Sequence, residues 1–83
     1  MQKLISEIEK NSTEVIRVEL SEFKGFDLVG MRVYALREGE DPTPTRKGIT
    51  CNVKLLPELK AGIIEAEQAA IEAGLLVKDH DGD

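Results

Sequence analysis

The sequence predicts an α+β fold, in which an antiparallel meander of β-strands precedes one long C-terminal helix. Two observations support this prediction. Segments rich in β-branched residues alternate apolar and polar side chains as far as Cys51, with turn-forming residues between them. From Leu56 onward, apolar residues instead recur at steps of three and four. A period of two is typical of half-buried strands, and the longer period is typical of an amphipathic helix.

The two clearest strand signals, residues 14–20 and 27–36, lie on either side of a Lys24-Gly25 turn. Each alternates between an apolar face and a mixed face that also carries polar groups. The apolar face comprises Ile16, Val18, Leu20, Val29, Met31, Val33 and Ala35. The mixed face comprises Val15, Arg17, Glu19, Leu28, Gly30, Arg32 and Tyr34.

Two weaker segments complete the predicted sheet. Residues 2–9 fit a helical turn or a ragged edge strand, and we favour the strand. Residues 45–51 form another candidate strand, which Gly48 interrupts and the polar loop 37–44 precedes.

The helix has one predicted start signal and one predicted stop signal. Asn52 is a good N-cap residue, and Gly74 is a plausible C-cap. Pro57 leaves the start open, because a proline inside the helix would disturb the hydrogen-bond ladder. The helix therefore begins either irregularly or near Leu56. We expect residues 78–83 to form a flexible polar tail.

Two apolar stripes give the helix more apolar surface than one small sheet face can cover. Alanines along it would let a second helix approach closely, so we expect antiparallel pairing with a second copy of the chain. The alternative is a helix buried only against its own sheet. The expected interface residues are Leu59, Ile63, Ala66 and Ala70.

Length and composition limit the possible classes. A chain of 83 residues forms one domain, which we place at residues 1–76, with an acidic tail at 77–83. Cys51, the single cysteine, permits neither a disulfide nor a Cys/His metal cluster, and its apolar-face position predicts a buried thiol. We find no signal peptide and no membrane span, so we expect a cytoplasmic protein without membrane partners. His80 and its acidic neighbours could hold a cation only loosely, and a solvated tail without metal or cofactor is the better interpretation.

Charge is polarised along the chain although the net charge is −5. Residues 23–54 carry six basic and four acidic groups, a balance of +2. The flanking segments are acidic, with balances of −2 over residues 1–22 and −5 over residues 55–83. Affinity for an anionic partner is thus expected from the middle segment alone.

Basic residues interleave with aromatic ones in that middle segment. The motifs are Phe23-Lys24-Gly25, Arg32-x-Tyr34 and Arg46-Lys47-Gly48-Ile49. Single strands of nucleic acid are bound by cations that track phosphates and by flat rings on which bases stack. The pattern alone only suggests such binding, since arginine and tyrosine on a strand face are more often solvated or packed.

Residues 20–34 followed by 44–50, with these motifs in this order and spacing, closely resemble the C-terminal domain of the transcriptional coactivator Positive Cofactor 4. The resemblance covers roughly residues 2–75. It implies a curved four-stranded antiparallel sheet followed by one helix (ββββα), dimerising through helix and sheet so that paired sheets form channels. Members of that family bind single-stranded DNA with little sequence preference and can destabilise duplexes. Bacterial and phage relatives, the group that this chain is similar to, are linked to replication and recombination.

The resemblance also implies roles for single residues. Phe23 corresponds to a base-stacking ring, Lys24 to a phosphate contact, and Arg32 to a basic contact on the sheet. Arg46 and Lys47 correspond to a phosphate pair. Neighbours on a strand point to opposite faces, so both can meet DNA only if a bulge or strand end near Gly48 re-aims one of them.

Two positions depart from the family pattern. Phe26 replaces a lysine of the turn, and Ala35 replaces an aromatic residue. Phe26 either stacks on a base or packs in the core or a dimer contact. Tyr34 is a base or sugar contact or a packing residue. Arg17 extends the basic surface or, as we favour, pairs with Glu19 or with a neighbouring strand.

No catalytic constellation is present, so we expect no enzyme activity. The competing hypothesis is a dimeric adaptor or coactivator module whose basic face binds replication or transcription proteins rather than DNA. The sequence does not separate DNA from RNA binding, since no element is dedicated to the 2′-hydroxyl.

Overall fold

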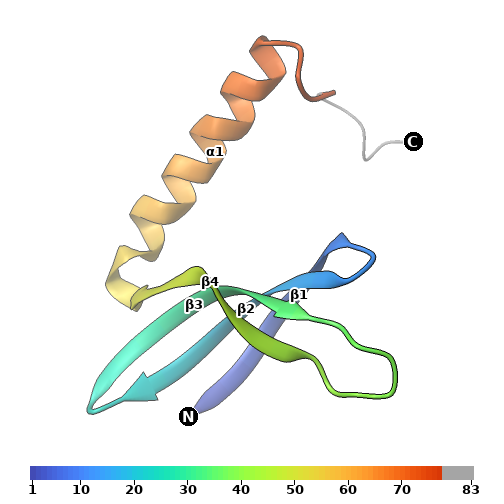
Figure 1. The fold of residues 1–83 in the computed structure, drawn as a ribbon. Helices are drawn as coiled ribbons and strands as arrows, with labels where there is room; N and C mark the ends of the chain where they lie inside the picture. The colour runs from blue at the N-terminus through green and yellow to red at the C-terminus, as the bar shows by residue number, and fades with distance from the viewer. Residues whose placement is uncertain (78–83) are drawn as a thin grey trace. The chain divides into compact units, whose positions relative to one another are not determined.

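A computed structural model of the protein, in which residues 1–77 are described, has four β-strands, one 3-10 turn and one α-helix within those residues (Figure 1). The elements in chain order are β1 (Gln2–Asn11), β2 (Glu14–Phe23), β3 (Phe26–Ala35), β4 (Thr43–Asn52), the 3-10 turn (Val53–Leu55) and α1 (Leu56–Glu72). This confirms the predicted ββββα order, with residues 2–9 as a strand. The strand unit, Met1–Val53, and the unit that begins at Lys54 are separate compact bodies. The prediction of one domain over residues 1–76 stays a prediction.

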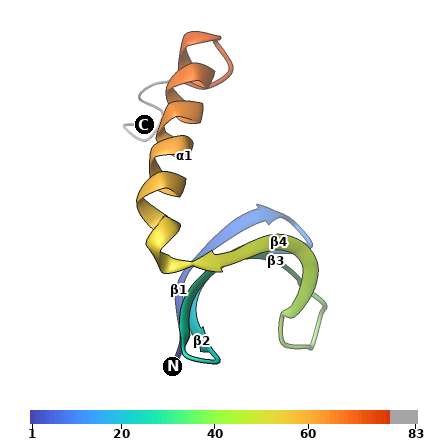
Figure 2. The ribbon, with the colours of Figure 1, turned by 90° about the vertical axis from the view of Figure 1, so that its left-hand side faces the viewer.

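The strands form one antiparallel sheet in the order β1-β2-β3-β4. Figure 2 shows that these strands bend strongly, so the sheet is curved. Lys24 and Gly25 connect β2 to β3 with φ angles of 52° and 83°. Positive φ at both positions defines a type I′ hairpin turn, whose twist matches that of the flanking strands. This turn lets β2 extend to Phe23, three residues beyond the predicted end.

The register confirms the predicted division into an apolar and a mixed face. Ile16 lies opposite Val33, Val18 opposite Met31, and Leu20 opposite Val29. The buried core is small and comprises Val29 and Val33 on the apolar face and Val15 on the mixed face. Residues of the apolar face nearer the edges stay open to solvent, as Ile8 and Ile49 are 51% and 48% exposed. Cys51 is only half-buried, which corrects the expected burial, because it lies on the edge strand β4.

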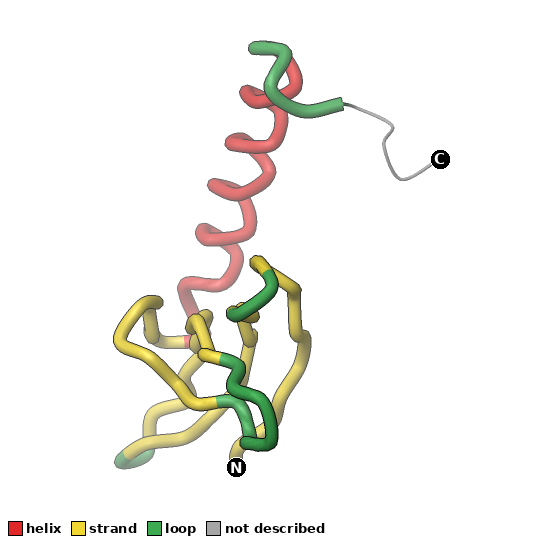
Figure 3. Tube along the Cα trace, turned by 45° about the vertical axis from the view of Figure 1, so that its right-hand side comes forward, coloured by secondary structure: helices red, strands yellow, loops and turns green. Residues whose placement is uncertain are grey.

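β4 begins at Thr43, so Pro44, expected in the preceding loop, is inside the strand. An edge strand tolerates proline because one side of its backbone makes no ladder hydrogen bonds. Figure 3 shows the loop that joins β3 to β4. The β3–β4 register shifts between the pairs Arg32–Gly48 and Tyr34–Pro44. Residues 45–47 therefore form a bulge opposite Val33, named the β4 bulge below. The structure thus contains the bulge near Gly48 that is required if Arg46 and Lys47 are both to reach DNA.

The predicted start signal of α1 is wrong, whereas the predicted stop signal at Gly74 agrees with the structure. Asn52 is not the N-cap: it ends β4, the 3-10 turn follows, and the N-cap is Leu55, which makes no side-chain capping bond. Pro57 lies in the first helical turn, where a backbone N–H would lack a helical partner anyway. Gly74 follows the C-cap with φ 78°, and the N–H groups of Gly74 and Leu75 donate to Ile71 and Ala70. These bonds form a Schellman motif.

Gly48 is expected to be indispensable to the β4 bulge. Its φ is 144°, and a Cβ there would meet the Met31 carbonyl and lie 2.7 Å from Arg32 Cα. We expect Gly48→Ala to lower the free energy of unfolding by roughly 2 kcal/mol or more, because strain and overlap with backbone atoms add. Chemical denaturation followed by circular dichroism measures this.

Gly30→Ala is the matched control, because a Cβ at Gly30 would lie at an ordinary 3.5 Å from Thr50 Oγ1. Equal stability of the two variants would contradict the account of Gly48.

Candidate nucleic-acid interface

The hairpin tip, Phe23 to Phe26, presents two aromatic rings to solvent. Phe23 and Phe26 are cross-strand partners that close the turn, and they are 61% and 60% exposed. Directly paired residues share a face, and the alternation along β2 and β3 assigns both rings to the mixed face. Lys24 Nζ lies 5.3 Å from the centre of the Phe23 ring. The tip thus combines two open rings with a cation.

The exposure of the Phe26 side chain rules out one of its predicted roles. A residue that is 60% exposed does not pack in the core of this chain, so the core interpretation is wrong. Base stacking and a contact to a second copy both stay predictions.

Arg32 has a structural role that the sequence analysis did not predict. It is half-buried, and its guanidinium donates from Nη1 to the Thr45 carbonyl (3.1 Å) and from Nη2 to Thr50 Oγ1 (3.0 Å). These bonds tie β3 to both sides of the β4 bulge. Arginine carries five N–H donors, so further donors remain for a phosphate. The predicted contact is thus compatible with the structure, but Arg32 first of all holds β4.

Arg46 and Lys47 both lie in the β4 bulge and are exposed. The Thr45 hydroxyl stabilises the bulge, since it donates to the Val33 carbonyl (2.8 Å) and accepts from the Lys47 N–H (3.1 Å). Lys47 Nζ lies 3.7 Å from a Glu14 carboxylate oxygen. The Arg46 side chain forms no hydrogen bond or ion pair with any residue among 1–77. Of the predicted phosphate pair, Arg46 is therefore the more available cation.

Arg17 and Tyr34 belong to one polar network on the mixed face. Arg17 Nε donates to Glu7 Oε2 on β1 (2.8 Å), and its guanidinium carbon lies 4.7 Å from the centre of the Tyr34 ring. The Tyr34 hydroxyl donates to Glu19 Oε1 (3.0 Å). Arg17 thus pairs with a neighbouring strand, as favoured. The half-buried Tyr34 ring packs against Arg17, and a base or sugar contact of Tyr34 stays a prediction. The sequence does not reveal Glu7 as the partner, because the register of β1 is irregular.

This network raises the pKa of two of its members. Burial and the hydrogen bond to the Glu19 carboxylate raise the pKa of Tyr34 above its ordinary value. The hydrogen bond to Glu7 raises the pKa of Arg17, so Arg17 stays charged.

Tyr34 offers a direct test of the network, because it is the single tyrosine and the chain has no tryptophan. We expect tyrosinate absorbance to titrate with a midpoint above the ordinary value of about 10. A raised pKa stabilises the fold below that ordinary value, and this contribution is lost as the pH rises through the folded pKa. Glu19→Gln should lower the midpoint, because the neutral amide no longer repels the phenolate.

Asp27→Asn is the control, because it also removes one negative charge from the sheet. Asp27 lies opposite Glu22 in the β2–β3 register, on the other face of the sheet from Tyr34, so this substitution should leave the midpoint unchanged. A Glu19→Gln midpoint identical to that of the wild type would contradict the Tyr34–Glu19 contact.

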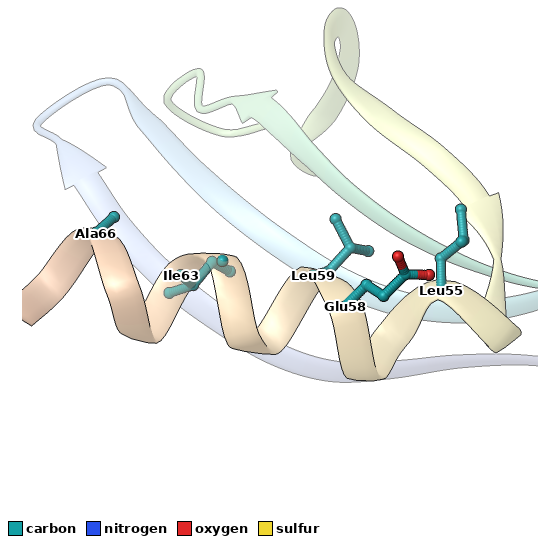
Figure 4. Close-up of a pocket in the computed structure, with 6 residues that line it drawn as sticks. Leu55, Glu58, Leu59, Ile63 and Ala66 are labelled. Atoms are coloured by element: carbon teal, nitrogen blue, oxygen red, sulfur yellow. The ribbon is translucent and has the colours of Figure 1, made fainter.

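Three of the four predicted interface residues, Leu59, Ile63 and Ala66, line an apolar groove on the helix unit (Figure 4). This helix groove has a volume of about 420 Å³ and is lined by Leu55, Glu58, Leu59, Gly62, Ile63 and Ala66. Ile63 is 59% exposed in the single chain. Of the four predicted residues, Ala70 is the one outside the lining. An open apolar groove of this kind is a surface on which a partner can bury apolar area.

Residues 1–77 contain no cluster of His, Cys, Asp and Glu side chains that could hold a metal ion. Within the same residues, no helix is long and apolar enough to span a membrane. His80 and the acidic tail lie outside the described residues.

An open, curved sheet with basic and aromatic groups on one face, followed by an apolar helix, is the architecture implied by the resemblance. The sequence model of the family Transcriptional Coactivator p15 (PC4) matches residues 10–62. The match spans more than half of the chain, so the chain belongs to the PC4 family.

Solved structures of PC4 homologues agree with this assignment. BPSL1147 from Burkholderia pseudomallei is 29% identical with a TM-score of 0.74, and the alignment covers 78% of this chain and 88% of that one. A second crystal form of BPSL1147 gives 28% identity, 81% and 98% coverage, and a TM-score of 0.73. The bacteriophage T5 homologue, implicated in recombination-dependent DNA replication, is 25% identical over 90% of this chain and 83% of its own, with a TM-score of 0.59. A comparison with curated protein sequences finds no match.

Proposed function

We propose that this protein binds single-stranded DNA with little sequence preference, as a homodimer and without catalysing a reaction. It acts on unpaired DNA in replication, recombination or transcription in the cytoplasm. The observation that carries the proposal is the hairpin tip, where Phe23 and Phe26 lie side by side, open to solvent, with Lys24 between them in the chain.

Exposed rings next to cations suit unpaired nucleic acid. Each base stacked on an aromatic ring contributes about 1 to 3 kcal/mol, whatever the base, because every base has a π-face. In a duplex the base faces are already stacked on one another, so the rings favour single strands. Phosphates provide the second attraction, for which Lys24 and Arg46 are exposed.

Family membership supports the proposal. The bacteriophage T5 homologue is implicated in recombination-dependent DNA replication, and this chain is similar to it over most of its length. The net charge of −5 confines attraction for DNA to the basic middle segment, so we expect weak binding to duplex DNA.

The exposed apolar surface of the helix supports the proposed homodimer. α1 contains no buried residue in the single chain, and the helix groove lies open along it. Burial of such surface is the main driving force of association. A second copy presents the same groove, so a two-fold contact satisfies both copies at once.

A fluorescence-anisotropy titration tests the proposal. The probe is a labelled oligothymidine of about 20 nucleotides, longer than a single binding site. We expect binding that duplex DNA competes for poorly and that weakens steeply with salt. No binding at low salt would refute the proposal. Binding of an acidic protein with no binding of DNA would instead support the adaptor.

A further inference from the structure

A row of charged residues crosses the mixed face. The β-sheet register aligns Glu7 of β1 with Arg17 of β2, Arg17 with Arg32 of β3, and Arg32 with Gly48 of β4. Two arginines are thus directly opposite each other, an arrangement that is destabilising unless anions are near. In the free protein, the Glu7 carboxylate is such an anion, at 2.8 Å from Arg17 Nε.

The Glu7–Arg17 ion pair is easy to open. The side chains of Glu7 and Arg17 are 43% and 22% exposed, and ion pairs in contact with water are weak. Glu7 lies on the edge strand β1, so its carboxylate can swing into solvent without moving the sheet.

Arg17 has a second contact that does not involve Glu7. Its guanidinium lies against the Tyr34 ring, and the Tyr34 hydroxyl is in turn held by Glu19. A cation–π contact of this kind restrains the guanidinium without using its N–H donors. Tyr34 thus acts as a positioning residue for Arg17.

We propose that the Glu7 carboxylate occupies at Arg17 the position that a DNA phosphate takes on binding, so that Glu7 limits the affinity of the mixed face for single strands. This inference rests on the proposed function and adds to it a competing group within the chain. Phosphate and carboxylate both present oxygen acceptors that fit a guanidinium, so one can replace the other.

The inference predicts a particular change in salt dependence. In the wild type, a phosphate that binds Arg17 releases its own counterion, but the displaced Glu7 carboxylate attracts a cation in exchange. The net number of released counterions is therefore about zero. Without the carboxylate, Arg17 adds one phosphate contact, which steepens the slope of log K against log salt by about 0.7 for single strands.

The test compares three variants of the whole chain in the oligothymidine titration. Glu7→Gln should raise the affinity about threefold to fivefold at low salt, as expected for one exposed charge contact, and steepen the salt slope. Glu9→Gln removes the same charge from the same strand and face, two residues away, and should change the slope little. In Glu7→Gln combined with Arg17→Gln, the gain should disappear.

Equal salt slopes for Glu7→Gln and the wild type would overturn the inference, as would a gain that persists without Arg17. Both outcomes leave the proposed function intact, because the wild type still binds. Failure of the wild type itself to bind oligothymidine would refute the proposed function and this inference together. Far-ultraviolet circular dichroism verifies that the variants are folded.

Discussion

Replacing both Phe23 and Phe26 by alanine is expected to weaken oligothymidine binding by at least about 30-fold, the loss for two stacked bases at about 1 kcal/mol each. Both residues are about 60% exposed, so removal of their rings should leave the stability of the sheet nearly unchanged. Fluorescence anisotropy measures the affinity, and thermal unfolding measures the stability.

Substitution by leucine separates stacking from general hydrophobicity. Phe23→Leu keeps apolar bulk at the tip but removes the flat ring, so it should lose most of what Phe23→Ala loses. The single variant Phe26→Ala decides the open alternative for that residue: a loss of DNA affinity indicates base stacking, whereas a loss of dimer indicates an interface contact. Unchanged affinity in the double variant would contradict the role of the tip.

The second large effect is expected at the helix groove. Ile63→Asp should convert the proposed dimer into a monomer of 9.2 kDa, because a carboxylate buried between two apolar helices would lack a partner. Sedimentation equilibrium measures the mass. The stability of the wild type should rise with protein concentration, as for any dimer, whereas that of the variant should not.

Ala61→Asp is the matched control for Ile63→Asp. It introduces the same charge into the same helix, but at about 100° per residue it lies on the side away from Ile63. A dimeric Ile63→Asp variant, or equal effects of the two substitutions, would contradict an interface at the helix groove.

The sequence predicted best where local chemistry determines geometry. The two-residue turn at Lys24-Gly25 is of type I′, with positive φ at both residues. A turn of fixed length sets the register of β2 against β3. The strand faces follow from that alignment by simple alternation. The same two-residue turn implies that Phe23 pairs with Phe26.

Prediction was weaker where strands deviate from regular alternation. β1 carries register irregularities between Leu4 and Ser6 and between Glu9 and Asn11, so the sequence does not reveal that Glu7 lies opposite Arg17. Side-chain bonds across strands, such as that from Arg32 to the Thr45 carbonyl, depend on the β4 bulge and cannot be read from spacing. Asn52 failed as an N-cap because a 3-10 turn separates it from the helix.

The central claim, that unpaired DNA binds the mixed face of the sheet, is tested most directly by nuclear magnetic resonance. The three aromatic residues, Phe23, Phe26 and Tyr34, all lie on that face, whereas Ile8 and Ile49 lie on the apolar face. On addition of oligothymidine, we expect the ring protons of Phe23 and Phe26 to shift most and the methyl groups of Ile8 and Ile49 to shift little. Shifts confined to the isoleucine methyls or to the helix, with unmoved phenylalanine rings, would contradict the account.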